Sequence, residues 1–144
     1  MKNLGELGER LVASWLKTQG YKLLHQGWSC RWGEIDLIAT HQCKACLIFV
    51  EVKTRGDRNW DSNGLLAIDT RKQEKICQTA MLFLAQNSKL AELPCRFDVA
   101  LVNYTLAANF DSRVNYLTTS QMTLNGDRYQ FNLQTYLKSA FELA

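Results

Sequence analysis

Apolar and polar residues alternate with a period of two in two runs near the middle of the chain. The runs are 33–39 (GEIDLIA) and 48–53 (IFVEVK), and alternation of this kind is typical of half-buried strands. The residues between them, 40–47, include His, Gln, Cys and Lys, which suits a turn. We therefore predict that the two runs form a β-hairpin, with Ala39 opposite Ile48.

This hairpin register predicts which charged side chains face each other. When the pairing is continued away from the connecting loop, Asp36 faces Glu51 and Glu34 faces Lys53. Residues two apart share one face of a strand. We therefore expect all four charges to project from the same side of the hairpin.

Apolar residues at spacings of three and four predict helices elsewhere in the chain. One helix is expected over 3–19, with Gly20 as its C-terminal stop. A second is expected over 71–86, with a capping-box pattern that begins at Thr70. Residues 131–141 are interpreted as a closing amphipathic helix.

Further strands are expected between these helices. Residues 21–28 suit a short strand, and 97–102 are apolar enough for a central one. The clearest later strand is 114–117, and Asn-Gly at 125–126 is a hairpin-turn signal. Helices and strands in this order predict a mixed α/β fold with a central β-sheet flanked by helices.

Two carboxylates that face each other on a sheet repel, because their Cβ atoms are only ~5 Å apart. A divalent cation bound by Asp36 and Glu51 would offset this repulsion, since hard ions prefer carboxylate oxygens. Lys53 would then add a positive charge at the edge of the metal site, where it can stabilise phosphate charge or orient a water molecule. The alternative is a solvent-exposed polar face without a ligand, and the spacing alone leaves both interpretations open.

The bulk properties are those of an ordinary globular protein. The 144 residues suit a single domain over 1–144, and 47% are hydrophobic and 22% charged. No apolar run reaches the ~18 residues of a membrane span, and no signal-peptide pattern is visible at the N-terminus. We therefore expect a cytoplasmic protein without a membrane partner. The net charge of +3 permits nucleic-acid binding without requiring it.

The chain has five cysteines, an odd number without a disulfide pattern. Reduced thiols are the expectation in the cytoplasm. Cys43 and Cys46 have the CxxC spacing of half a zinc site, and His41 could join them. No second CxxC or CxxH follows, so we interpret this segment as a turn of the hairpin.

Asp36, followed after fourteen residues by Glu51-Val52-Lys53, resembles the signature of PD-(D/E)XK nucleases. In more detail, GEIDLIA at 33–39 with FVEVKTR at 49–55 resembles the YraN family of small bacterial proteins. That family is similar to archaeal Holliday junction resolvases and has a restriction-endonuclease-like fold. The resemblance extends to further motifs: GE at 8–9, GY at 20–21, RKQ at 71–73, CRFDV at 95–99 and AF at 140–141.

The resemblance implies a catalytic site with assigned roles. Asp36 and Glu51 would bind Mg²⁺ or Mn²⁺, and Lys53 would position the attacking water. Glu9 would complete the metal site directly or through water, because resolvase-like nucleases place an acid in this Gly-Glu context. Glu6 is a competing candidate for the same position, and the sequence does not decide between them.

Several cations are candidates for contacts with nucleic acid. Arg31 precedes the hairpin acids, and Arg55 and Arg58 follow Lys53 in a polar segment. Arg71 and Lys72 open the second helix, where cations oppose the helix dipole and therefore suggest a partner. That partner is either a phosphate or the nearby acids Asp69 and Glu74. Lys72 matches a lysine of the family motif.

The sequence therefore favours a metal-dependent DNA endonuclease that hydrolyses phosphodiester bonds. Branched DNA is the substrate that the resemblance suggests, and a homodimer is implied because resolvases cut two strands. The alternative is a nucleic-acid-binding accessory protein that has the nuclease fold with little or no turnover. The chain still has Asp36, Glu51 and Lys53 of the nuclease motif. Their presence argues against an active site that has simply lost its residues.

Overall fold

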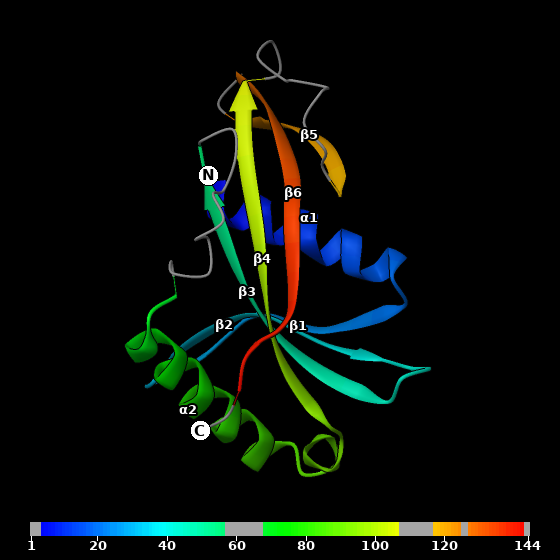
Figure 1. The fold of residues 1–144 in the computed structure, drawn as a ribbon, viewed down its shortest axis with the longest axis vertical. Coiled ribbons are helices and arrows are strands. Elements are labelled where there is room, and N and C mark those ends of the chain that lie inside the picture. Colours follow the sequence, from blue (N-terminus) through cyan, green and yellow to red (C-terminus); the bar gives the residue numbers. More distant parts are fainter. Residues whose placement is uncertain (1–3, 57–67, 107–116, 125–126, 143–144) are drawn as a thin grey trace.

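A computed structural model describes residues 4–56, 68–106, 117–124 and 127–142 of the chain. Figure 1 shows long helices packed against one strongly twisted sheet. The elements are α1 (Leu4–Thr18), β1 (Tyr21–Cys30), β2 (Gly33–His41), β3 (Cys46–Arg55), α2 (Thr70–Gln86), the short 3₁₀ helix η2 (Leu90–Glu92), β4 (Cys95–Leu106), β5 (Thr118–Leu124) and β6 (Asp127–Phe141). None of the helices in these ranges is long and apolar enough to cross a membrane.

The six strands form one mixed sheet in the order β1-β2-β3-β4-β6-β5. Strands β3 and β4 are parallel and are connected through α2, whereas the other neighbouring pairs are antiparallel. This is the α/β, restriction-endonuclease-like architecture that the sequence predicted, with a central mixed sheet flanked by helices. The expected central strand at 97–102 is part of β4, which lies between β3 and β6.

Each face of the sheet carries its own hydrophobic core. Leu11, Val12 and Leu16 of α1 pack with Val50 and other residues of one face. On the opposite face, α2 contributes a second cluster that includes Ile76, Ala80 and Phe83. Successive residues of β3 alternate between the two clusters, and 47–52 are all buried. Strand β3 is therefore covered on both faces and is not the half-buried strand that the sequence predicted.

The predicted hairpin register is confirmed near the turn, where Ala39 pairs with Ile48. The ladder between β2 and β3 ends at Leu37 and Val50. Beyond that point β2 continues to pair with β1, whereas β3 continues beside β4. The predicted pairings of Asp36 with Glu51 and of Glu34 with Lys53 are therefore wrong as ladder pairs.

The divergence of β2 from β3 also breaks the alternation of side chains along β2. Ile35 belongs to the core on the α2 face, whereas Leu37, two residues later, belongs to the core on the α1 face. A regular strand would place both side chains on one face. Asp36 lies between them, just beyond the end of the ladder with β3, while β2 stays paired with β1 on either side of it.

Both predicted early helices are present, with one correction. Helix α1 ends before Gly20, which has a φ of +91° that favours glycine. The N-cap of α2 is Asp69, whose carboxylate accepts a hydrogen bond from the Lys72 amide. The Thr70 capping box is therefore wrong, because the helix begins at Thr70, one residue earlier than that pattern required. Gln73 instead donates to the carbonyl of Ile68.

The predicted closing helix at 131–141 is wrong, because these residues belong to β6. Phe131 and Leu133 are both fully buried and pack on one face, which is the period of a strand. The predicted 114–117 strand lies mostly outside the described residues, and so does Asn-Gly at 125–126. The strands around that dipeptide pair antiparallel, with Leu124 opposite Asp127.

A buried carboxylate joins β4 to the bend near the end of β6. Asp98 is fully buried and accepts two hydrogen bonds from Arg96, at 2.8 and 2.9 Å. It also accepts from the Tyr136 hydroxyl at 2.6 Å and from the Ser139 amide at 3.0 Å. Ser139 has a φ of +51°, so these bonds hold a strained backbone position in place. Arg96 and Asp98 therefore form a salt bridge within β4.

Asp98→Asn is expected to lower the free energy of unfolding by about 2 kcal/mol. Both Asp98 oxygens accept hydrogen bonds. In either orientation of the asparagine amide, its NH₂ group replaces one of these oxygens, so the donors at that position lose their acceptor. Urea unfolding measures this loss, and Glu92→Gln, an exposed acid on η2, is the matched control. Equal midpoints for the two variants would contradict this account of Asp98.

Candidate metal centre

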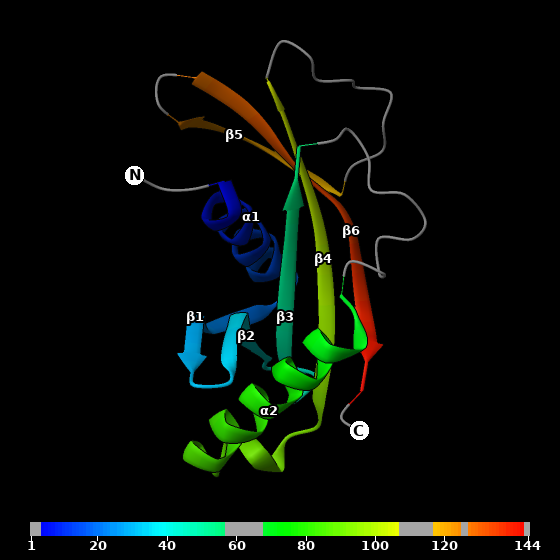
Figure 2. The same cartoon turned by 90° about the vertical axis from the view of Figure 1, so that its left-hand side faces the viewer.

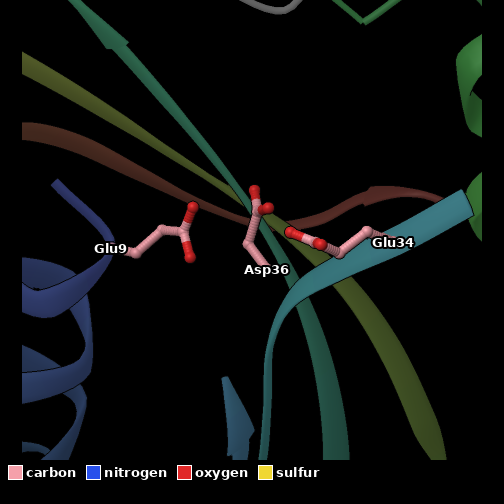
Figure 3. Close-up of side chains that lie close together, drawn as sticks. All are labelled: Glu9, Glu34 and Asp36. Atoms are coloured by element: carbon pink, nitrogen blue, oxygen red, sulfur yellow. The ribbon is translucent and has the colours of Figure 1, made fainter. Parts of the chain in front are cut away.

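Three carboxylates gather where β2 diverges from β3. One oxygen from each of Glu9, Glu34 and Asp36 lies within 4.8 Å of the others. Figure 3 shows Asp36 between the other two, with Glu9 reaching in from α1 and Glu34 from β2. Figure 2 shows why these elements meet, since α1 and the β1–β2 hairpin lie on the same side of β3.

Each acid is positioned by the element that carries it. The Val52 amide of β3 donates to Asp36 Oδ2 at 2.8 Å, so Asp36 bridges the gap that opens between the two strands. Glu9 borders the apolar stripe of α1 and is half-buried. Glu34 is exposed and pairs with Ser29 of β1.

Proximity and burial make these acids hard to ionise together. Burial, together with the negative charge of Glu51, raises the pKa of Asp36 to about 8, although the bond from Val52 opposes the shift. Burial and the charges of Glu34 and Glu51 raise the pKa of Glu9 to about 7. The site therefore holds protons at neutral pH when no cation is bound.

Glu51 lies beside this group and is held by two lysines. It is only 7% exposed, and its Oε1 lies 3.5 Å from Lys53 Nζ and 3.1 Å from Lys72 Nζ. Burial and the hydrogen bond with Lys72 lower the pKa of Lys53. Burial also disfavours the charge on Lys72, but its bonds to Lys53 and Glu51 outweigh this and raise its pKa. Two strand residues and one helix residue thus form a compact charged triad.

The donor set fits a hard divalent cation. Carboxylate oxygens are the ligands that Mg²⁺ and Mn²⁺ prefer. Among the residues that the structure describes, no ion pair involves Glu9, Glu34 or Asp36. A cation among these oxygens would remove the repulsion that raises the pKa values of Asp36 and Glu9. The residues present therefore suit a metal, with Glu51 adjacent.

The structure brings together all four of the predicted catalytic residues. Asp36 and Glu9 lie in the acidic group, and Glu51 and Lys53 lie directly beside it. Glu9 is in the group and Glu6, the competing candidate, is not. Metal binding by Asp36, Glu51 and Glu9 stays a prediction.

Glu34 is the site residue that sequence reasoning missed. It was placed on the hairpin opposite Lys53 and given no ligand role. Its position two residues before Asp36 was the available signal, because such residues share a strand face.

The predicted nucleic-acid contacts divide into three groups. Lys72 lies at the site because it contacts Glu51, so the acid that pairs with it belongs to β3. Arg31 and Arg71 are exposed, and Arg55 is half-buried at the end of β3. Arg58 lies outside the described residues.

The CxxC segment does not form a zinc site in the described part of the chain. Cys43 is exposed, and none of the five cysteines forms a disulfide within the described residues. His41 Nδ1 accepts from the Lys44 amide, and its Nε2 lies 3.1 Å from the Gln19 carbonyl oxygen. The histidine therefore holds the turn, as the loop interpretation implied.

Comparisons with known proteins agree with the resemblance. Residues 8–102 match the family described as "Uncharacterised protein family UPF0102". A UPF0102 protein of Trichormus variabilis is 45% identical, covering 97% of this chain and 95% of the relative. Another, of Synechocystis sp., is 45% identical and covers 98% and 99%. One of Acaryochloris marina is 44% identical and covers 97% and 90%. The chain therefore belongs to the UPF0102 family, the family to which the hairpin motifs pointed.

Proposed function

We propose that this protein is a metal-dependent endonuclease that hydrolyses phosphodiester bonds in DNA. The observation that supports this most strongly is the convergence of Glu9, Glu34 and Asp36 beside the Glu51–Lys53 pair. A purely structural role does not explain three acids that gather in this way next to a lysine. Perturbed groups of this kind suit a reaction in which charge develops on a phosphate.

Glu9, Asp36 and Glu51 would hold Mg²⁺ or Mn²⁺, with Glu34 as a further oxygen donor. When bound, the cation supplies Lewis-acid stabilisation of the phosphate and lowers the pKa of water. The chain's own contribution is to fix these ligands on three separate elements. The bond from the Val52 amide orients Asp36, and the two lysines orient Glu51. Preorganised ligands avoid reorganisation during the reaction.

Lys53 is placed to act on the attacking water and on the phosphate. Its ammonium lies next to Glu51 and half-buried in the site. In hydrolysis a water oxygen attacks phosphorus, the bond to the leaving oxygen breaks, and the added negative charge falls on the phosphate oxygens. Lys53 would position that water and offset the charge.

Cleavage assays test the proposal directly. The protein is incubated with four-way junctions, flaps, linear duplex and single strands, with Mg²⁺ or Mn²⁺. We expect cleavage, and we expect Asp36→Asn and Lys53→Met each to reduce its rate at least ~10²-fold. Matched controls are Glu92→Gln and Lys138→Met, which change exposed residues of η2 and β6.

Branched DNA is the substrate class that this proposal favours, and a two-fold symmetric homodimer would allow two strands to be cut. Cleavage of junctions in preference to linear duplex would support both. Binding without any cleavage, unchanged by Asp36→Asn and Lys53→Met, would overturn the enzyme proposal. That result would favour the nucleic-acid-binding accessory protein.

A further inference from the structure

The turn between β1 and β2 exposes a tryptophan that stands two residues before Glu34, a member of the acidic group. Trp32 is 42% exposed, and it is the aromatic member of the exposed large apolar side chains in the described ranges. The nearby Trp28 packs against Phe83 in the core and gains from burial of its ring. Trp32 gains less from burial, because its ring is exposed. The exposed ring is available to a ligand that stacks on aromatic side chains.

The turn holds this ring in a defined place. Cys30 and Gly33 are paired across the ends of the two strands, so Arg31 and Trp32 alone make the connection. The Trp32 amide lies 3.4 Å from Cys30 Sγ as a donor. Gly33, at a φ of +150°, gives the chain a conformation that a side chain would strain. The ring is therefore presented by a short hairpin turn and not by a long loop.

Arg31 adds a positive charge to the same surface. Its guanidinium carbon lies 4.8 Å from the centroid of the Trp32 ring, in cation–π range. A flat ring with an adjacent guanidinium matches a base with its adjacent phosphate, because the base stacks and the phosphate pairs with the cation. An apolar protein partner would not require the charge.

Trp32 is close in the chain to one of the acids. Trp32 is two residues before Glu34, so their Cα atoms are at most ~7 Å apart. Glu34 in turn contributes an oxygen to the group with Glu9 and Asp36. A strand whose phosphate lies at the acids would therefore bring a neighbouring nucleotide close to the turn.

We infer that Trp32 stacks on an unpaired base of the DNA substrate, with Arg31 contacting the adjacent phosphate. The inference rests on the proposed function and narrows its substrate class. A base within a duplex has both faces covered by its neighbours, so only a single-stranded segment or a branch point offers a free face. Stacking of this kind carries no sequence preference, since every base has a π-face.

Equilibrium binding tests this inference separately from catalysis. Affinities are measured with Mn²⁺ and hydrolysis-resistant oligonucleotides: a single strand, a flap and a blunt duplex of equal length. Trp32→Ala is expected to weaken binding to the first two at least ~5-fold and to leave the duplex within ~2-fold. Trp32→Phe should retain most of the affinity, because it keeps a ring. Met81→Ala, which truncates an exposed apolar residue of α2, is the control.

Arg31→Ala gives an independent readout. Loss of one phosphate contact should weaken binding to all three DNAs alike and reduce the slope of log K against log salt by about 1. On a cleavable flap, Trp32→Ala should raise KM and leave kcat within ~2-fold.

Equal loss on single strand and duplex for Trp32→Ala, or no loss on either, overturns the stacking inference. Cleavage by the wild type with an unaffected Trp32→Ala would refute the inference and leave the proposed nuclease intact. If Trp32→Ala selectively loses single-strand binding but the wild type cleaves no DNA, the stacking inference is supported and the proposed nuclease is refuted.

Discussion

Gly8→Ala is expected to disable the acidic site without changing any of its charges. Gly8 of α1 faces Thr54 of β3, and a Cβ added at residue 8 would fall on Thr54 Oγ1. It would also lie 3.3 Å from Thr54 Cβ and 3.4 Å from its Cγ2. Glu9 is the next residue of the helix. Relief of the overlap therefore moves α1 away from β3 and carries the Glu9 carboxylate away from Asp36.

Gly8→Ala is expected to lower the stability through overpacking and the Mn²⁺ affinity through displacement of Glu9. We expect unfolding to become about 2–3 kcal/mol easier and the Mn²⁺ affinity to fall at least ~10-fold. Thermal unfolding with and without Mn²⁺ measures both effects. Gly5→Ala, an exposed position on the same helix, is the control and should stabilise by up to ~1 kcal/mol.

A second substitution at Thr54 separates packing from other effects. Thr54 Oγ1 is buried without a hydrogen-bond partner among the described residues, so Thr54→Val alone should be nearly neutral. Thr54→Ala combined with Gly8→Ala should restore most of the Mn²⁺ affinity, whereas Thr54→Val combined with Gly8→Ala should not. The metal affinity of Gly8→Ala with Glu9→Gln should equal that of Glu9→Gln alone. Additive losses in that pair would refute the positioning role of Gly8.

The metal-free protein is expected to become less stable as the pH rises from about 4 to about 8. The pKa of Asp36 is about 8 in the folded chain, against ~3.9 in an unfolded one. The folded state therefore binds more protons in this window, and the free energy of unfolding falls with pH. The stabilisation by protonated Asp36 is fully present below its pKa in the unfolded chain. It is lost as the pH rises to its pKa in the folded chain. Glu9, with a pKa of about 7, acts in the same direction.

At ~1.4 kcal/mol per pKa unit, Asp36 accounts for a loss of about 2–4 kcal/mol between pH 5 and pH 8. Saturating Mn²⁺ should reverse this trend, because a cation binds the ionised carboxylates and stabilises only the folded state. The increase in melting temperature on adding Mn²⁺ should therefore be larger at pH 8 than at pH 6. Urea and thermal unfolding across this range measure both effects.

Asp36→Asn is the decisive variant for this prediction. The amide oxygen can still accept the bond from Val52, and the charge is removed. The metal-free variant should be more stable than the wild type at pH 8 and should respond little to Mn²⁺. Glu92→Gln should follow the wild type throughout. A flat stability profile for the metal-free wild type would contradict the burial of ionisable Asp36 described above.

Local signals in the sequence were sufficient for several elements. Gly20 ended α1 because its φ is positive, and the apolar spacing of 71–86 matched α2. The polar segment between the two hairpin strands correctly predicted the position of the turn. It thereby predicted the pairing of Ala39 with Ile48. These features depend on residues close together in the chain, where period and turn chemistry are informative.

Patterns that suit two structures at once were decided by packing. Apolar residues at 131, 133, 137 and 141 are compatible with a helix or a strand. Pairing with β4 made the segment a strand, because it covers an edge that would otherwise be open. The C-terminal helix was therefore predicted wrongly for a reason that no local window contains.

The sequence by itself determined the family and the α/β class, and it placed Asp36, Glu51 and Lys53 on one predicted hairpin. Only the tertiary structure decided how the acids meet. The divergence of β2 from β3 turned Asp36 out of the ladder, and the docking of α1 brought Glu9 to it beside Glu34. Carboxylates repel, so no local preference would assemble them. The burial of apolar surface on both faces of the sheet holds them together, and that is a property of the whole fold.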